Sequence, residues 1–397
     1  MSGPLEGFRV LDLGQLIAGP WAATMLADQG ADVIKLERPG MGDLFRYVGS
    51  SRNGMSGMFH LLNRGKRSLA LDLGRPEGVE VFLALARTAD VIVQNLRPGV
   101  VDRLGVGYQA VRAVRDDIVY LSLSGFGPEG PYSQRGAYDN VIQSYSGLAD
   151  AQANPETGEP EFVRQLLTDK LTAWAGAQAV TAALLSRALG RGGQHVELAM
   201  LDAAISFMWP DRAGHRTLLG EGIDEQPPLG PNFKLLELAD GYGTATAFTD
   251  AEFAGLCQAL GLADVAADPR LSSTAVRMQN LDHLTATYRD AIGPAAAKLD
   301  RETFERELVA QDVPHGVVRS IDELHTDPHI VATGVFVERD HAIAGRLREP
   351  RHPARFHGTP LDGVGDAPAL GQHSDEILAD IDLGARTAEL RSSGVVG

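Results

Sequence analysis

The sequence predicts an α/β protein with two domains: a large one built on a doubly wound, mostly parallel, Rossmann-like sheet, and a smaller mixed α/β one. Before Phe207, short apolar runs alternate with segments of helical spacing. This alternation is typical of parallel strands joined by helices that cover both faces of a sheet. After Phe207 the pattern changes, and proline and glycine interrupt residues 208–235. With 397 residues, 44% of them hydrophobic, the chain is long enough for two lobes.

The large domain is expected to begin with a strand at 8–13, a helix over 20–29 and a second strand at 32–37. Further strands are expected at 68–73, 91–96 and 118–123, with a buried one at 195–200 and helices over 76–88 and 171–189. Ligands of open parallel sheets bind beyond the carboxyl ends of the strands. Those ends carry Gly14 to Ala18, Arg38, Asp72, Asn95 to Arg97 and Ser124 to Gly127.

The predicted domain divisions are 1–208 for the large domain, 209–325 for the small domain, and 326–397 for a C-terminal segment that returns to the large domain. The small domain is expected to hold a strand at 242–248 and helices over 251–260, 275–291 and 301–310. The last segment is expected to contain a hairpin over 336–348, turning at Ala344-Gly345, and a capped terminal helix over 374–380.

Charge and motif content exclude several functions. The net charge of −16 argues against a nucleic acid or an anionic membrane as partner. The single cysteine, Cys257, fits a reducing cytosol, and the N-terminal residues lack the features of a signal peptide, so a cytoplasmic location is expected. There is no GxSxG, Walker or HExxH motif and no Cys-based metal spacing. We therefore expect neither a metal site nor a permanently bound cofactor.

Asp169 is the first candidate catalytic residue, because it stands at the start of a segment, Leu171 to Ser186, that contains no charged residue. The segment is expected to form a buried helix that ends at Gly190 to Gly193. A carboxylate in the first turn of such a helix faces unpaired N–H groups, which favours its ionised form and makes it available as a nucleophile. The alternative is that Thr168 or Asp169 is a plain helix cap.

Two loops contain further candidates. Asp139 lies in a Gly/Pro-rich loop before a helix, and it either takes part in a site or caps that helix. Residues 41–66 are irregular and glycine-rich, as expected of a loop over a site. The basic cluster at 64–67 is either a phosphate contact or solvated surface.

Six stretches, taken together and in order, resemble the class III CoA-transferases. This family includes formyl-CoA and carnitine CoA-transferases and, as a sister branch, the α-methylacyl-CoA racemases. The stretches are VLDLGQLIAGP, GADVIKLERPGMGD, NRGKRSLALDL, NLRPGVVDRLGVGY, SLSGFGPEGPYSQRGAYDNVIQ, and LTDK followed by GRGGQHVELAMLDA. The resemblance covers most of the chain and is densest over residues 5–207.

The resemblance implies a CoA-transferase in which Asp169 attacks the thioester of an acyl-CoA, and aspartyl-CoA then passes the CoA to a carboxylic acid. It also implies an interlocked homodimer, and coenzyme A or acyl-CoA as a substrate. The implied CoA contacts are Ile17, Ala18, Arg38, Leu71, Asp72, Leu73, Gly74, Asn95, Leu96, Arg97, Arg103 (a nucleotide-phosphate contact), Ala137, Tyr138 and Asp139.

The sequence departs from the family pattern at several places. Ile17 and Gly74 stand where formyl-CoA transferase has glutamine and lysine, and Arg75 is a candidate replacement for that lysine. The glycine-rich loop that formyl-CoA transferase places over its active site has no clear match in 229–238, so the acid is expected to be larger than formate or oxalate.

Two alternatives to a transferase remain. An α-methylacyl-CoA racemase or another acyl-CoA isomerase uses the same fold, but racemases carry Gly-His-Asp where this chain has Ala137-Tyr138-Asp139. A tyrosine is a poor replacement for the histidine as a base near neutral pH. A non-catalytic CoA-binding protein is the other alternative, and it is less favoured because Asp169 is present.

Overall fold

The computed structural model describes residues 3–224, 234–361, 363 and 365–397. It divides into two compact units, Met1–Met208 with Thr333–Gly397, and Trp209–Ala332. Of the segment 229–238, in which the glycine-rich loop has no clear match, residues 229–233 lie outside the described residues. Each unit is described by itself below.

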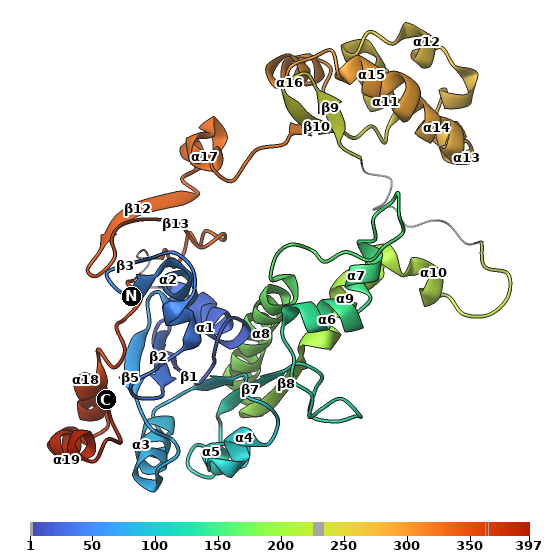
Figure 1. The fold of residues 1–397 in the computed structure, drawn as a ribbon. Helices are drawn as coiled ribbons and strands as arrows, with labels where there is room; N and C mark the ends of the chain where they lie inside the picture. Colours follow the sequence, from blue (N-terminus) through green and yellow to red (C-terminus); the bar gives the residue numbers. More distant parts are fainter. Residues whose placement is uncertain (1–2, 225–233, 362, 364) are drawn as a thin grey trace. The chain divides into compact units, whose positions relative to one another are not determined.

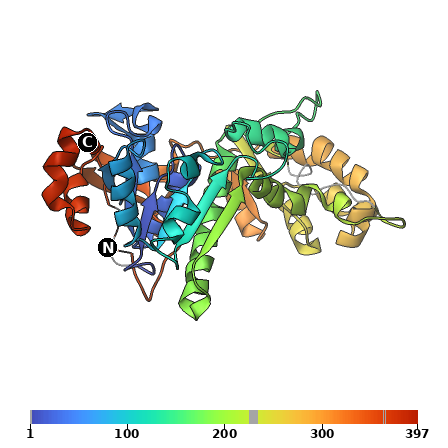
Figure 2. The same ribbon diagram turned by 90° about the horizontal axis from the view of Figure 1, so that it is seen from below.

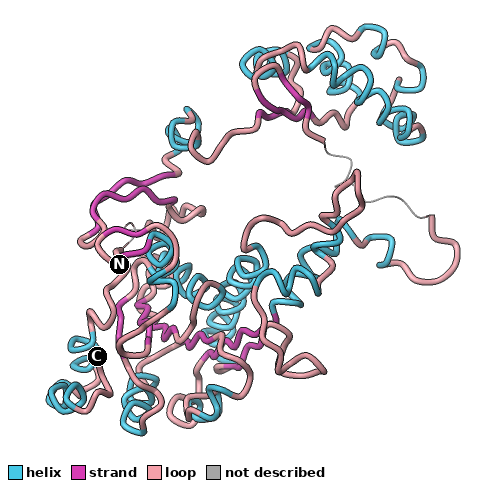
Figure 3. The backbone as a smooth tube through the Cα atoms, viewed as in Figure 1, coloured by secondary structure: helices cyan, strands magenta, loops and turns pink. Residues whose placement is uncertain are grey.

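A six-stranded sheet forms the centre of the first unit (Figures 1 and 3). Its strands are β1 (Arg9–Asp12), β2 (Asp32–Glu37), β5 (Arg67–Ala70), β6 (Val91–Gln94), β7 (Val119–Ser124) and β8 (Gln194–Ala199). Their order is β5-β2-β1-β6-β7-β8, and every pair is parallel. The expected parallel sheet is confirmed. The order reverses between β1 and β6, where a ligand crevice forms in sheets of this kind.

Both faces of this sheet are covered, because successive apolar residues of each strand point to opposite faces. On one face, Val10 and Val33 pack with helices α1 (Ala18–Asp28) and α8 (Leu167–Ser186). On the other face, Leu11 and Ile34 pack with α3 (Pro76–Ala86) and with apolar residues from the C-terminus of the chain. The strand β8 is an edge strand in which Gln194 and Glu197 are exposed and only Ala199 is fully buried, so the expectation of a buried strand there is wrong.

The helix α8 lies close to the sheet because Gly176 faces it. A methyl group at Gly176 would lie 3.1 Å from Leu121 Cδ2 and 3.7 Å from Ala22 Cβ, so a larger residue would push α8 away from the sheet and from α1. The helix passes into a π turn over Arg187–Arg191, and Gly190 has a φ of 80°. The predicted left-handed end of this helix is confirmed.

The C-terminal segment packs on the first unit, beside the N-terminal strands (Figure 2). Helices α18 (Ser374–Asp380) and α19 (Thr387–Ser392) cover the β5 side of the sheet, and the N–H of Gly397 donates to the Ala70 carbonyl. Strands β12 (Phe336–His341) and β13 (Gly345–Pro350) form the predicted hairpin. The helix at 374–380 has the predicted bounds, but no side chain caps it and it is not the last helix.

Residues 41–66 are more regular than predicted. They contain a 3-10 turn over Leu44–Tyr47, a short hairpin of β3 (Ser51–Arg52) and β4 (Met55–Ser56), and helix α2 (Gly57–Asn63). The Ser56 hydroxyl accepts from the N–H of Phe59 and starts α2. The glycines in this stretch mark its turns, which is why its composition resembled that of an irregular loop.

The first unit also contains several short helices that connect its strands. They are α4 (Val100–Arg103), α5 (Tyr108–Arg112), α6 (Asp139–Tyr145) and α7 (Leu148–Ala151). The chain passes from the first unit to the second within helix α9 (Met200–Arg212). It returns to the first unit within helix α17 (Pro328–Thr333).

The second unit has a three-stranded antiparallel sheet, ordered β11-β10-β9, with helices around a small core. The strands are β9 (Leu236–Leu238), β10 (Gly241–Ala245) and β11 (His315–Val317). The helices are α10 (Gly214–Thr217), α11 (Asp250–Ala259), α12 (Ala263–Ala266), α13 (Thr274–Gln279), α14 (Leu281–Thr287), α15 (Gly293–Ala296) and α16 (Arg301–Ala310). The helix predicted over 275–291 is interrupted at Asn280 and continues as α14 and a π turn. Among the described residues, no helix combines the length and hydrophobicity needed to span a bilayer.

Candidate active site

A pocket of about 370 Å³ lies at the carboxyl ends of β1, β2, β5 and β6; it is called the polar pocket below because charged side chains line it together with several leucines. Its walls come from the segments that follow these strands. They include Gly14, Gln15, Arg38, Asp43, Leu71, Asp72, Leu73, Gly74 and Leu96. The rule that ligands bind beyond the carboxyl ends of parallel strands therefore led to a real pocket. The structure brings together at this pocket the candidates Arg38, Leu71 to Gly74, and Leu96.

Three arginines close to this strand edge are free. Among the described residues, the guanidinium groups of Arg38, Arg97 and Arg103 make no hydrogen bond or ion pair. Arg38 lines the polar pocket, and Arg103 lies at the end of α4, which follows β6. Exposed cations without internal partners are suited to bind phosphate groups.

The other candidates near this edge hold the loops in place. The side chain of Asn95 makes two 2.8 Å hydrogen bonds to the backbone N–H and carbonyl of Gln15. The carboxylate of Asp72 accepts from the N–H of Gly74 at 2.9 Å and so fixes that turn. The guanidinium of Arg75 donates to the carbonyl of Ser393. In this conformation Arg75 therefore serves the C-terminal segment and not the pocket, so the structure does not place it as the replacement for lysine.

Asp169 and Asp139 lie side by side, although they come from different helices. Asp139 is the first residue of α6 and is 2% exposed. Its Oδ2 accepts from the hydroxyl of Thr168 at 2.9 Å and from the N–H of Asp169 at 3.1 Å. Its Oδ1 accepts from Gln143 Nε2 at 2.6 Å. Asp139 thus caps the first turn of α8 and not its own helix, and no side chain of α8 caps that turn.

The environment of Asp169 keeps it from being a permanent anion. Burial, together with the charge of Asp139, raises the pKa of Asp169 to about 7. The sequence-based expectation of a stably ionised carboxylate is therefore wrong. The N–H groups of the first turn were expected to stabilise the anion, but the N–H of Asp169 is already bonded to Asp139. Near neutral pH, Asp169 is poised between its two protonation states.

Close packing brings the loop before α6 to this pair. A methyl group at Gly125 would lie 2.2 Å from Ala137 Cβ, so only glycine allows the two loops to approach. A methyl group at Gly136 would lie 2.7 Å from Arg97 Nη2, so Arg97 lies next to the same loop. The side chain of Tyr138 is 67% exposed and points away from the core.

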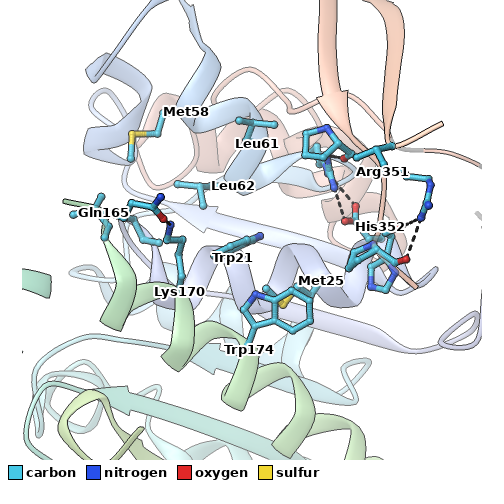
Figure 4. A pocket seen from close by; sticks show the side chains of 17 residues that line it. Trp21, Met25, Met58, Leu61, Leu62, Gln165, Lys170, Trp174, Arg351 and His352 are labelled. Carbon is cyan, nitrogen blue, oxygen red and sulfur yellow. Dashed lines mark hydrogen bonds and ion pairs between the residues drawn. The ribbon is translucent and has the colours of Figure 1, made fainter. Parts of the chain in front are cut away.

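A second, mainly apolar pocket of about 700 Å³ lies against the start of α8 (Figure 4). It is lined by residues of α1, α2, α8, the loop before α1 and the segment after β13, among them Ile17, Trp21, Met25, Met58, Leu62, Lys170, Trp174 and Pro353. Lys170 directly follows Asp169, and its ammonium donates to Gln165 Oε1 at 2.9 Å. Of the sequence candidates, Ile17, Arg64 and the segment 41–66, through Met58, Leu61 and Leu62, line this pocket, and sequence reasoning missed its other walls. The only signal was that two of the chain's three tryptophans, Trp21 and Trp174, belong to the adjoining helices.

The cations of the basic cluster at 64–67 are paired with carboxylates of the protein, which does not support their interpretation as a phosphate contact, although Arg64 also lines the apolar pocket. Arg64 pairs with Asp28 and Glu349, and Arg67 pairs with Asp32, among other carboxylates. The ammonium of Lys66 is fully buried. All three cations have carboxylate partners within the protein. Among the residues with defined placement, no group of histidine, cysteine, aspartate and glutamate side chains is arranged to hold a metal ion.

The fold and this site define an α/β protein with a pocket at its strand ends and a pair of neighbouring carboxyl groups, Asp139 and Asp169, at the start of α8. The family model described as CoA-transferase family III matches residues 5–374. The chain belongs to CoA-transferase family III.

Relatives and solved structures support this assignment over almost the whole chain. A succinate–glutarate CoA-transferase of Agrobacterium fabrum is 31% identical, with 97% of each chain covered. A succinyl-CoA:mesaconate CoA-transferase of Haloarcula hispanica is 34% identical, with 98% of this chain and 99% of the relative covered. The crystal structure of a CAIB/BAIF family protein from Brucella suis has a TM-score of 0.81 at 31% identity, covering 96% of this chain and 100% of that chain.

Proposed function

We propose that this protein moves CoA from an acyl-CoA thioester to a free carboxylic acid, with Asp169 as the covalent nucleophile. The observation that carries the proposal is the position of Asp169 beside Asp139, with its pKa raised to about 7. A carboxyl group with a pKa near the working pH is a stronger nucleophile, once ionised, than an ordinary aspartate. The family assignment supports the same function.

The proposed reaction uses two exchanges at the Asp169 carboxyl group. An oxygen of ionised Asp169 attacks the thioester carbonyl carbon, the C–S bond breaks, and an aspartyl acyl anhydride and CoA thiolate form. The thiolate attacks the aspartyl carbonyl, which releases the first acid as a carboxylate and leaves aspartyl-CoA thioester. The incoming carboxylate attacks that thioester and displaces the thiolate, which then attacks the new acyl carbonyl and restores Asp169.

We assign the polar pocket to the nucleotide end of CoA. Arg38, Arg97 and Arg103 would hold the phosphates, and the loops at 17–18, 71–74, 95–97 and 137–139 would line the path of the CoA molecule toward Asp169. Asn95 and Asp72 would act through the loops that their side chains fix. The acids named for the relatives are dicarboxylates, namely succinate, glutarate and mesaconate, and these are the first acids to test.

The experiment that tests the function is mass spectrometry after incubation with an acyl-CoA panel and hydroxylamine, which converts an activated aspartyl group into a hydroxamate. We expect the modification at Asp169, and none in Asp169→Asn. Absence of any adduct, together with exchange of the α-proton of a branched acyl-CoA for deuterium, would contradict the transferase and leave the racemase.

Removing a free arginine is expected to weaken CoA binding without changing the chemical step. For Arg38→Gln we expect KM for acyl-CoA to rise about tenfold, since a charge-assisted hydrogen bond to phosphate is worth roughly 1.5–3 kcal/mol. The value of kcat should stay within about twofold, because a contact made equally in the ground and transition states changes KM alone. Steady-state kinetics at several salt concentrations measures both, and Arg216→Gln, in the second unit, is the control. An unchanged KM would remove Arg38 from the site.

We also propose that the protein is a homodimer. Helix α8 and the π turn that follows it carry Trp174, Leu185 and Leu189, which are 49%, 62% and 65% exposed, and such exposed apolar side chains favour contact with another chain. Sedimentation equilibrium is expected to give twice the chain mass. A monomer at micromolar concentration would contradict the proposal.

A further inference from the structure

The backbone of residues 14–16, between β1 and α1, is held entirely by side chains from outside the loop. The N–H of Gly14 donates to Asp12 Oδ1 at 2.8 Å, and its carbonyl accepts from Lys35 Nζ at 3.0 Å. Asn95 holds both polar groups of Gln15. The N–H of Leu16 donates to Asp43 Oδ2 at 3.2 Å. Three consecutive residues are thus fixed without helix or strand hydrogen bonding.

Leu16 is forced into a conformation that leucine avoids. Its φ is 64°, in the left-handed region, where the side chain of an L-residue crowds the following carbonyl oxygen. Such a conformation persists only where the surroundings impose it. At Leu16 the constraint comes from the hydrogen bond to Asp43 and from the fixed neighbours Gly14 and Gln15.

The side chains behind this loop form a buried ion network. Lys35, Lys66, Asp12 and Asp43 have side chains no more than 1% exposed. Lys66 Nζ lies 2.8 Å from Asp12 Oδ2 and donates to the carbonyl of Pro20, in the first turn of α1, at 2.7 Å. Lys35 Nζ lies 3.1 Å from Asp43 Oδ2 and 4.0 Å from Asp12 Oδ2. The network therefore holds both the loop and the start of α1.

Stability alone does not account for such a network. Four charges have lost their water, and replacing a buried ion pair with packed apolar residues is often neutral or stabilising. The network sits directly beneath the part of the loop that separates the two pockets. Gly14, Gln15, Lys35 and Asp43 line the polar pocket, and Ile17 lines the apolar one.

We propose that Asp12, Lys35, Asp43 and Lys66 are positioning residues. They fix the loop at 14–17 between the polar pocket and the apolar pocket at the start of α8. The proposal rests on the proposed function, because the loop matters when a CoA thioester passes along it toward Asp169. Lys35 and Asp43 also line the polar pocket, but the role proposed for the network is exerted through the loop. The network fixes the position of the loop, and the loop forms part of the wall of both pockets.

The network also predicts an alkaline limit to activity. Burial lowers the pKa of Lys66 to about 8, and the charged groups that face it are Asp12, Lys35 and Asp43. Above that pH, Lys66 loses its proton and Asp12 loses the nearer of its two cations, so the loop is held less firmly. Asp169 is ionised throughout this range, so its titration does not produce the fall.

The test compares Lys66→Met, which removes the ammonium, with the milder Asp43→Asn, which keeps an acceptor for Leu16 but loses the charge. Lys298→Met and Asp264→Asn are matched controls at exposed positions of the second unit. In both network variants we expect amide hydrogen exchange to become at least tenfold faster in the peptide that covers 13–19. We also expect kcat/KM to fall at least tenfold, and the wild-type decline above pH 8 to be absent in Lys66→Met.

Unchanged exchange in that peptide, or faster exchange in every peptide together with a loss of activity proportional to unfolding, would overturn the proposal. In that case the network would only stabilise the fold. If Lys66→Met does not fold, Asp43→Asn decides. If the wild type transfers CoA to no acid, the proposed function fails. Amide hydrogen exchange in the peptide that covers 13–19, and the Kd for CoA measured by calorimetry, still test the positioning role.

Discussion

Asp169→Asn is expected to lower CoA transfer by on the order of 10³-fold or more, because the amide has nearly the same shape as the carboxyl group but is not a nucleophile. The same substitution is expected to make the ligand-free protein more stable at pH 8. The reason is the raised pKa: burial and the charge of Asp139 disfavour the carboxylate of Asp169 in the folded protein.

The size of this stabilisation depends on pH. The folded protein holds the proton of Asp169 up to a pKa of about 7, whereas the unfolded chain releases it at the ordinary aspartate value near 4. The stabilisation due to the protonated group is therefore complete below pH 4 and is lost as pH rises through 7. Above pH 7 the buried charge is a cost that Asn removes.

Urea unfolding at pH 8 and at pH 4 measures the difference. A displacement of about three pH units corresponds to roughly 4 kcal/mol, and water at this partly exposed carboxyl reduces it, so we expect a gain of about 1–2 kcal/mol at pH 8. At pH 4 the gain should vanish. The exposed control Asp150→Asn should show no gain at either pH. An equal gain in stability at pH 8 and pH 4 would mean that the asparagine stabilises the protein by packing. Burial would then not destabilise the ionised form of Asp169.

Local patterns sufficed for much of the fold. The strands of the large sheet, the helix Arg301–Ala310 and the hairpin at 336–350 each carry their signal within a few residues, as apolar periodicity or a glycine turn. The interruption at Asn280 was not visible, because the residues on both sides keep helical spacing. Helix α2 was missed because the glycines of the preceding turns dominated the composition.

The candidate site was predictable where it follows from topology and not where it depends on distant contacts. The strand-end rule placed Arg38 and Asp72 at one edge before their neighbours were known, and the family resemblance added Leu71, Leu73 and Gly74. The apolar pocket has a wall at Pro350 to Pro353, which no local pattern connects with Trp21. The protonation of Asp169 depends on Asp139, which is thirty residues earlier and reaches α8 from another helix. Long-range burial decides such properties, and a single sequence does not show it.

Asp139→Asn is expected to separate the two causes that raise the pKa of Asp169. Removing the charge leaves burial as the remaining cause, so the pKa should fall while staying above the ordinary value near 4. The pH midpoint at which kcat/KM rises should move down by about one unit. At pH 6 the variant should then retain a larger share of its own maximal rate than the wild type does.

The same substitution is expected to cost about 1–3 kcal/mol of folding free energy. An asparagine that keeps its oxygen toward Thr168 and Asp169 must turn its NH₂ toward the NH₂ of Gln143. Gln143 is fixed, since its Oε1 accepts from the N–H of Val163 at 2.9 Å and its Nε2 donates to backbone carbonyls. Two buried donors would face each other, and one hydrogen bond would be lost.

A pH–rate profile and urea unfolding of the same preparation test both parts of this prediction, with Asp150→Asn as the exposed control. A fall in stability with an unchanged midpoint would show that Asp139 serves only to cap α8, and that burial alone sets the protonation of Asp169. A shifted midpoint would make Asp139 the residue that matches the nucleophile to neutral pH. Its charge keeps part of Asp169 protonated in the free protein, and the carboxylate that does form is therefore more reactive.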